Sequence, residues 1–198
     1  MRILAFTDVH GNKKIIDELI IKSKEADLLI CCGDITNLGN NLENILISFK
    51  NINKKLIIIP GNHENYEDIK ILCRKYNFLV DVHLKKFIMG KIVFFGFGEG
   101  GFNYIDKELE TEIGKISFNN KDKIIFISHG PPYGTKLDKL EKIGHTGSKS
   151  LTKFIKQFKP KLALCGHLHE NFGKKDRIIE TLIINPGRNG CIIEIEEK

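Results

Sequence analysis

The sequence lacks an apolar run long enough to cross a membrane. Near its start the longest wholly apolar run is Leu28–Cys32, far short of the roughly 20 residues that a membrane helix needs. The first residues offer only Ile3–Phe6 before Asp8, which is too short an apolar stretch for a secretory signal. We therefore expect no membrane association, no export and a cytoplasmic location.

Cysteine is also scarce, and nothing in its spacing predicts disulfides or a zinc site. The five cysteines are an odd number, and no two of them form the Cys-x-x-Cys pair typical of zinc ligands. Without an export signal we expect reduced thiols, packed in the core because free cysteine is among the most buried residue types. They are Cys31, Cys32, Cys73, Cys165 and Cys191.

No linker, repeat or low-complexity tract divides the 198 residues. Hydrophobic residues make up 41% of the chain and charged residues 28%, as in an ordinary globular protein, so residues 1–198 are expected to form one domain. The net charge of +6 suits an anionic partner such as phosphate or nucleic acid. The lysines are scattered without a basic block, however, so a lysine-rich surface is the simpler explanation of the charge.

Short apolar runs alternate with amphipathic stretches, which predicts an α/β fold. Continuous β-branched runs indicate strands buried on both faces, as in largely parallel sheets. The predicted strands are Ile3–Phe6, Asp27–Cys32, Leu56–Ile59, Ile124–Ser128 and Lys161–Cys165, and the predicted helices are Asn12–Lys24, Leu42–Phe49, Tyr66–Tyr76 and Ser150–Phe158. A hairpin is predicted for Phe87–Met89 with Ile92–Phe97, and an antiparallel closing pair for Ile178–Ile184 with Cys191–Ile195.

Carboxylate, amide and imidazole side chains follow each of the five predicted strands. The carboxyl ends of strands are where open α/β sheets bind ligands. Oxygen and nitrogen donors without a thiolate suit manganese, iron, zinc or nickel, and these donors outnumber what one ion needs. They are Asp8, His10, Asp34, Asn62, His63, His129, His167 and His169. Any one of them alone is more often a helix cap or a surface side chain, so only the whole set argues for a metal centre.

The order Asp-x-His, Gly-Asp, Gly-Asn-His-Glu, Ser-His-Gly and Gly-His-x-His resembles the calcineurin-like metallophosphoesterase superfamily. The resemblance runs from Asp8 to His169, and the Asn185-Pro186-Gly187 turn is similar to the ending of the small prokaryotic phosphodiesterase-like members. It implies a four-layer α/β/β/α sandwich with two mixed β-sheets. It also implies two metal sites that share the Asp34 carboxylate. One ion would bind Asp8, His10, Asp34 and His169, and the other Asp34, Asn62, His129 and His167.

The activity that the resemblance implies is that of a binuclear metal-dependent phosphoesterase. Two divalent ions, with manganese favoured, lower the pKa of a bridging water, so that a metal-bridging hydroxide can attack phosphorus in line. A protonated His63, which binds no metal, would donate to the leaving group or stabilise its charge. The implied substrate is a small or flexible phosphodiester. Nucleic acid is less favoured, because the chain is too short for an extra DNA-grasping domain.

The alternative function is a non-catalytic metal-binding scaffold or interaction module on the same fold. Such a scaffold would be expected to lack a metal ligand or the catalytic imidazole. This sequence has a suitable residue at all eight positions.

The sequence departs from the protein phosphatases of this superfamily just after Asp34. Asn37 stands where their motif has the aspartate that orients the histidine, and Leu38 replaces their phosphate-gripping arginine. These differences favour phosphodiesters over phosphomonoesters. They also leave two interpretations of Glu64, as a partner of His63 or as an exposed turn residue.

Substrate contacts are predicted at Asn12 and His145. Asn12 is alternatively the N-cap of the following helix, which we prefer, and after His145 either Thr146 or Ser148 is expected to cap the next helix. The loops 97–118 and 131–148 are expected to determine specificity.

Overall fold

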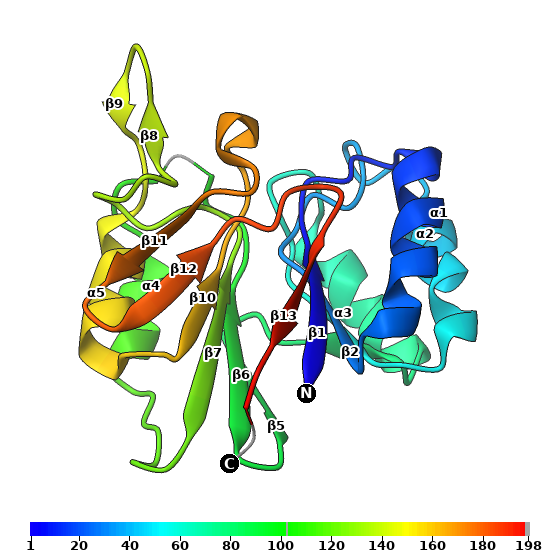
Figure 1. The fold of residues 1–198 in the computed structure, drawn as a ribbon, viewed down its shortest axis with the longest axis horizontal. Coiled ribbons are helices and arrows are strands. Elements are labelled where there is room, and N and C mark those ends of the chain that lie inside the picture. Colours follow the sequence, from blue (N-terminus) through cyan, green and yellow to red (C-terminus); the bar gives the residue numbers. More distant parts are fainter. Residues whose placement is uncertain (102, 197–198) are drawn as a thin grey trace.

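Two β-sheets pack face to face between two layers of helices in the computed structural model, which describes residues 1–101 and 103–196 (Figure 1). The order of layers is therefore α/β/β/α, and both large sheets are mixed, which confirms the fold class predicted from the sequence. None of the helices in these two stretches combines the length and the apolar character needed to span a bilayer.

The first sheet has the strand order β13-β1-β2-β3-β4. Its four parallel strands are β1 (Arg2–Phe6), β2 (Leu28–Cys31), β3 (Leu56–Ile58) and β4 (Leu79–Asp81), and β13 (Cys191–Glu194) runs antiparallel to β1. Its outer face is covered by α1 (Lys13–Lys22), α2 (Leu42–Ser48) and α3 (Tyr66–Lys75). Short 3₁₀ turns follow α1 and α2 at Ser23–Glu25 and Lys50–Ile52.

The second sheet has the strand order β11-β12-β10-β7-β6-β5. Its four parallel strands are β6 (Ile92–Phe97), β7 (Lys123–Ser128), β10 (Leu162–Leu164) and β12 (Thr181–Ile184), and the antiparallel edges are β5 (Lys86–Met89) and β11 (Lys175–Ile178). Its outer face is covered by α4 (Lys107–Ile113) and α5 (Lys149–Phe158). A small hairpin of β8 (Lys139–Leu140) and β9 (Gly144–His145) projects from one end of the molecule, and His169–Asn171 form a 3₁₀ turn.

The alternation of side chains along β1 shows why its residues are apolar without a break. Ile3 and Ala5 point into the layer between the two sheets, whereas Leu4 and Phe6 point toward the helices of the first sheet. All four are fully buried. A strand with both faces covered has no polar side, so a continuous apolar run is what this position in the fold requires.

The helix α5 shows how local sequence positions the second helical layer. Its N-terminus is capped by Ser148, whose side chain accepts a hydrogen bond from the backbone N–H of Leu151. Leu151, Phe154 and Ile155 then lie on one face of the helix and are buried against the second sheet. Ser148 is thus the cap, rather than Thr146.

The predicted strands and helices are confirmed, apart from shifts of one or two residues at their ends. The predicted hairpin is also present as β5 and β6. The predicted closing pair is wrong, because Ile178–Ile184 and Cys191–Ile195 lie in different sheets. Ile179 has a positive φ of 55° in a turn inside the first of these runs, so the run is a β11–β12 hairpin rather than one strand. The chain then crosses between the sheets through Asn185-Pro186-Gly187.

The cysteines are free, as predicted. Cys31, Cys32 and Cys165 are buried in strand ends, and burial raises the pKa of all three thiols. Cys73 and Cys191 are only partly buried, so core packing explains three of the five.

Substitution of Phe154 tests the packing of the second helical layer. Its buried ring stacks on Phe126 with centroids 4.1 Å apart and on Phe95 with centroids 5.3 Å apart. We expect Phe154→Ala to lower the free energy of unfolding by about 3–5 kcal/mol, because it removes this packing and leaves a cavity. Urea denaturation measures the change, and Ile71→Ala on the exposed side of α3 is the control, with an effect under about 1 kcal/mol. Equal effects of the two substitutions would contradict this packing.

Candidate metal centre

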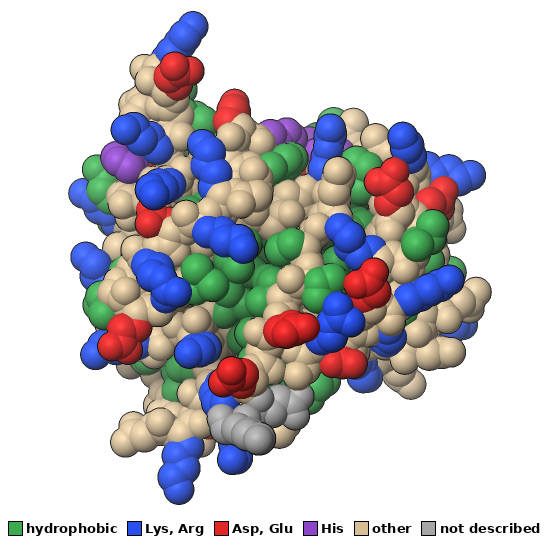
Figure 2. All heavy atoms as spheres, viewed as in Figure 1, with side chains coloured by type: hydrophobic (Ala, Val, Ile, Leu, Met, Phe, Trp, Pro, Cys, Tyr) green, Lys and Arg blue, Asp and Glu red, His purple; other side chains and the backbone are tan. Residues whose placement is uncertain are grey.

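The predicted ligands lie where strands of both sheets reach their carboxyl ends. Asp8 and His10 follow β1, Asp34 follows β2, Asn62 and His63 follow β3, His129 follows β7, and His167 and His169 follow β10. In Figure 2, histidine side chains gather at the upper edge of the molecule, whereas lysine and arginine side chains are spread over the whole face in view. The two sheets therefore contribute to one common edge.

Four of these residues have left-handed backbone conformations. Asp8 has a φ of 53°, His10 of 50°, Asp34 of 51° and His167 of 68°. Such conformations cost a non-glycine residue about 1–3 kcal/mol each and occur mostly at functional sites, where the surrounding structure imposes them. These backbone conformations turn the side chains of the short loops toward the groups of potential ligands described below.

Two glycines allow the loops to approach one another closely. A Cβ atom on Gly61 would lie 2.0 Å from Oδ1 of Asp34, and a Cβ atom on Gly166 would lie 1.9 Å from Oγ1 of Thr7. Only glycine can occupy these positions without moving the neighbouring loop. The glycines that precede Asn62 and His167 are thus required by close packing around the carboxylates of Asp34 and Asp8.

The first group of potential ligands consists of Asp8, His10 and His169. Nε2 of His10 lies 3.2 Å from Nε2 of His169, which lies 3.5 Å from Oδ1 of Asp8. The other ring nitrogen of His10, Nδ1, is 3.2 Å from the carbonyl oxygen of Thr36. Since a carbonyl only accepts, Nδ1 of His10 carries the proton and Nε2 presents its lone pair to the group.

The second group consists of Asp34, His129 and His167, with Asn62 beside them. Nε2 of His129 lies 3.4 Å from Oδ2 of Asp34 and 3.0 Å from Oδ1 of Asn62. Nδ1 of His129 lies 2.9 Å from the carbonyl oxygen of Cys32, to which it donates. With the proton of Nδ1 fixed in this way, Nε2 of His129 faces two oxygen acceptors and can carry there either a second proton or a metal ion.

The third group, His10, Asp34 and His63, joins the other two. Oδ2 of Asp34 lies 4.0 Å from Nε2 of His10 and 3.9 Å from Nε2 of His63. Nδ1 of His63 is the acceptor of a 3.1 Å hydrogen bond from the backbone N–H of Leu38. His63 therefore carries its proton on Nε2, the nitrogen that faces the centre, and has no lone pair there for a metal.

The unsatisfied acceptors of these groups fit a cation. Oδ1 of Asp8 is buried and has no hydrogen-bond partner among residues 1–101 and 103–196. Two oxygen atoms, Oδ2 of Asp34 and Oδ1 of Asn62, also converge on Nε2 of His129. Buried acceptors that face one another in this way repel unless a proton or a metal ion lies between them. The donor set of carboxylate, amide and imidazole is also one that divalent transition metals accept.

The electrostatics of the centre follow from the same contacts. Burial by itself raises the pKa of Asp34, but the hydrogen bond and charge of His129 and the backbone N–H of His63 outweigh it and lower this pKa. Burial by itself lowers the pKa of His129, and the contact with Asp34 outweighs it, so that this pKa is raised. For His167, burial and the nearby His129 lower the pKa to about 4, which leaves a neutral imidazole, the form that binds metals.

Glu64 is a component of the centre that the sequence did not reveal. It is 7% exposed, so the interpretation as an exposed turn residue is wrong. Its Oε2 accepts hydrogen bonds of 2.9 Å from the backbone N–H groups of Asp34 and Gly61, and its Oε1 accepts from the backbone N–H and hydroxyl of Thr36 at 2.9 and 2.6 Å. One carboxylate thus ties the loop after β2 to the loop after β3. Its position directly after Gly61-Asn62-His63 was the only signal in the sequence.

The predicted substrate contacts lie outside the three ligand groups. Oδ1 of Asn12 accepts a 3.2 Å hydrogen bond from the backbone N–H of Ile15, so this side chain is the N-cap of α1, the interpretation that the sequence favoured. His145 lies on β9, where Nδ1 is 2.8 Å from the buried carboxylate of Asp138. Of the two loops expected to determine specificity, 131–148 contains this hairpin and 97–118 contains α4, and Phe102 in the latter is outside the described residues.

Known proteins resemble this chain over most of its length. A family model described as calcineurin-like phosphoesterase matches residues 1–171. The uncharacterized protein MJ1162 of Methanocaldococcus jannaschii is 33% identical over an alignment of 198 positions. This alignment covers 94% of this chain and 88% of that protein. The probable glycerophosphodiester phosphodiesterase GpdQ of Arcobacter nitrofigilis is 28% identical over 189 residues, which cover 84% of this chain and 66% of that protein.

The fold is similar to that of solved structures as well. The crystal structure of TT1561 of Thermus thermophilus aligns with a TM-score of 0.75, covering 94% of this chain and 88% of its own. The two sequences are 15% identical, so this likeness shows a common fold.

Glu64→Gln tests the role of the buried carboxylate. The substitution keeps the shape of the side chain but turns an NH₂ group toward backbone N–H donors. We therefore expect the free energy of unfolding to fall by about 2–4 kcal/mol. We also expect the affinity for Mn²⁺ to fall about 10- to 100-fold, as for other residues that orient ligands. Urea denaturation and calorimetric titration measure the two effects.

Glu67→Gln is the matched control, because Glu67 lies on the surface of α3 and forms an ion pair with Lys70 at 2.7 Å. Its effect on unfolding should stay below about 1 kcal/mol. Wild-type stability and wild-type Mn²⁺ affinity in Glu64→Gln would show that the buried carboxylate does not organise the centre.

Proposed function

The chain belongs to the calcineurin-like phosphoesterase family, and we propose that it hydrolyses small phosphodiesters with two divalent metal ions. The observation that carries this proposal is the position of Asp34. Its Oδ2 faces imidazoles from both sheets, within 3.4 Å of His129 and 4.0 Å of His10. One carboxylate between two groups of donors is the arrangement that a pair of bridged ions needs.

The proposed ligands follow from the two outer groups. Asp8, His10 and His169 would hold one ion, Asn62, His129 and His167 would hold the other, and Asp34 would bind both. Such ions supply Lewis acidity and a nucleophile derived from water at neutral pH. Manganese is the ion that we favour, since the carboxylate and amide oxygens of this set suit it.

His63 is the proposed catalytic residue. Its ring meets that of His10 edge to face with centroids 4.7 Å apart, and the Leu38 N–H holds its proton on Nε2. From this position Nε2–H can donate to the oxygen that leaves phosphorus. Because Nδ1 accepts the Leu38 N–H, His63 presents its Nε2–H to the leaving oxygen as a hydrogen-bond donor that stabilises the developing charge.

The preference for diesters rests on the residues after Asp34. Leu38 has no guanidinium group, and its side chain is 74% exposed. At this position the loop therefore has no cationic side chain to bind the additional negative charge of a phosphomonoester. The relative from Arcobacter nitrofigilis is described as a probable glycerophosphodiester phosphodiesterase, which agrees with this preference.

Metal removal tests the proposed centre. The enzyme should hydrolyse bis(4-nitrophenyl) phosphate with Mn²⁺, more slowly hydrolyse 4-nitrophenyl phosphate, and lose activity on chelation. Asp34→Asn should weaken the binding of both ions by more than about 100-fold, because it removes a ligand rather than a residue that orients one. Elemental analysis should find two ions per chain in the wild type. A protein that binds metals but hydrolyses no phosphate ester would instead be a scaffold.

His63→Ala tests the catalytic residue. We expect kcat for bis(4-nitrophenyl) phosphate to fall by about 10²–10⁴-fold, the usual contribution of a positioned proton donor. The metal content should remain that of the wild type, because His63 is not among the proposed ligands. Loss of a metal ion in this variant, or unchanged kcat, would refute the role assigned to His63.

A further inference from the structure

An aromatic cluster with a lysine lies beside the proposed metal centre. The rings of Tyr104 and Tyr133 meet edge to face with centroids 5.0 Å apart, and the ring of His145 lies 5.6 Å from that of Tyr133. The ammonium group of Lys149 lies 4.6 Å from the centroid of the Tyr104 ring and 5.3 Å from that of Tyr133. We name Tyr104, Tyr133, His145 and Lys149 the aromatic–lysine cluster.

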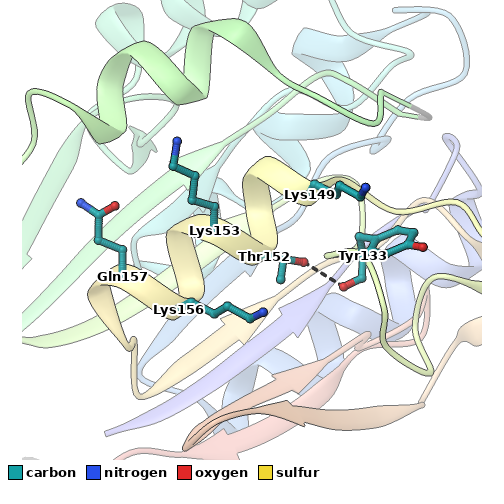
Figure 3. Close-up of a pocket in the computed structure, with 6 residues that line it drawn as sticks. All are labelled: Tyr133, Lys149, Thr152, Lys153, Lys156 and Gln157. Atoms are coloured by element: carbon teal, nitrogen blue, oxygen red, sulfur yellow. Dashed lines mark hydrogen bonds between the residues drawn. The ribbon is translucent and has the colours of Figure 1, made fainter.

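A surface groove of about 540 Å³ extends from this cluster along α5 (Figure 3). Figure 3 shows Tyr133 and Lys149 at one end of α5 and Gln157 at the other. Lys153 forms an ion pair with Glu110, whereas no ion pair to Lys149 or Lys156 is found within the described residues. The groove thus combines aromatic surface with uncompensated positive charge, in a volume that suits a small ligand.

The cluster is connected to the metal centre by two short segments. A Cβ atom on Gly101 would lie 3.3 Å from Cε1 of His167, and Tyr104 is only three residues further along the chain. Tyr133 follows His129 by four residues and is fixed by hydrogen bonds of its backbone with Ser148 and Thr152. Three residues span at most about 11 Å, so the rings lie within reach of a substrate whose phosphate is at the metal centre.

We propose that the aromatic–lysine cluster binds the nucleoside part of a nucleotidyl phosphodiester. The inference rests on the proposed function, since it identifies the class of substrate that the same centre would hydrolyse. A nucleobase has a flat π-face that stacks on tyrosine, and the phosphates attached to a nucleoside are attracted to lysine.

The combination of groups distinguishes this ligand from simpler ones. An anion without a ring would use Lys149 and Lys156 but not the exposed face of Tyr104, which is 43% exposed. An uncharged aromatic group would use the rings but gain nothing from the lysines. Stacking and positive charge side by side are typical of sites for single nucleotides and single-stranded nucleic acid. The size of the groove favours a single nucleotide.

A pair of substrates with the same leaving group tests this proposal. Thymidine 5′-(4-nitrophenyl) phosphate and methyl 4-nitrophenyl phosphate differ only in the nucleoside. We expect a lower KM for the thymidine ester. Tyr104→Leu and Tyr133→Leu should each raise the ratio of the KM for the thymidine ester to that for the methyl ester about 5-fold or more, as for the loss of one stacked base. Tyr133→Phe should restore the ratio because the ring remains.

Two control variants carry the same changes elsewhere. Tyr76→Leu at the end of α3 and Lys50→Gln in the 3₁₀ turn after α2 should leave the ratio at its wild-type value. Lys149→Gln should raise it, because the ammonium group of Lys149 packs on the rings of both Tyr104 and Tyr133 and helps to position them. Equal KM values for both esters in the wild type, or equal changes of both KM values in the variants, would refute the cluster as a nucleoside site. Hydrolysis of the methyl ester would still support the proposed function in that case.

A binding measurement separates this proposal from hydrolysis altogether. The chain has four tyrosines, so spectra of protein labelled with ¹³C in tyrosine rings contain few signals. Thymidine 5′-monophosphate, added to the metal-free protein, should shift the signals of Tyr104 and Tyr133 but not those of Tyr66 and Tyr76. Inorganic phosphate should not reproduce the shifts. Absent shifts, or identical shifts with inorganic phosphate, would overturn the proposal even for a protein that hydrolyses neither ester.

Discussion

The buried carboxylate of Asp34 is the interaction on which the rest of the centre depends. Its Oδ1 is held at 2.9 Å by the backbone N–H of His63, and its Oδ2 faces imidazole nitrogens from loops of both sheets. Glu64 in turn holds the backbone N–H of Asp34. A shift of this one loop would therefore change both the distance between the two ligand groups and the position of His63, the proposed catalytic residue, because the Asp34 side chain faces all of them.

The centre is built at a cost to the fold, which a bound cation would offset. Left-handed backbone at Asp8, His10 and Asp34 is strained, and Oδ1 of Asp8 is buried with no donor among the described residues. The surrounding apolar layers hold these residues in place, since Phe6 and Cys31 at the strand ends are fully buried. A ligand that binds only the folded chain stabilises it by mass action, so metal binding at this centre would be coupled to folding.

The strand ends could be predicted from sequence because a strand with both faces buried needs an unbroken apolar run. His129 and His167 could be placed at one edge for the same reason, since parallel strands align their carboxyl ends. The contact of Glu64 with Asp34 and that of the Leu38 N–H with His63 could not be predicted. Both contacts join loops that are far apart in the sequence, and no local pattern encodes them. Likewise, Cys191–Glu194 pair with β1, at the other end of the chain, and their composition is equally compatible with a neighbouring strand.

The charge balance around the centre connects the proposed chemistry with the proposed substrate. A phosphodiester carries one negative charge fewer than a phosphomonoester dianion, so it needs fewer cationic groups at phosphorus. At that point the loop after Asp34 provides the uncharged Leu38 rather than an arginine. Discrimination between diesters must then come from groups beyond the metal ligands, because the ions treat all such phosphates alike. Tyr104, Tyr133 and Lys149 are placed one short loop away from His167 and His129 and offer such groups.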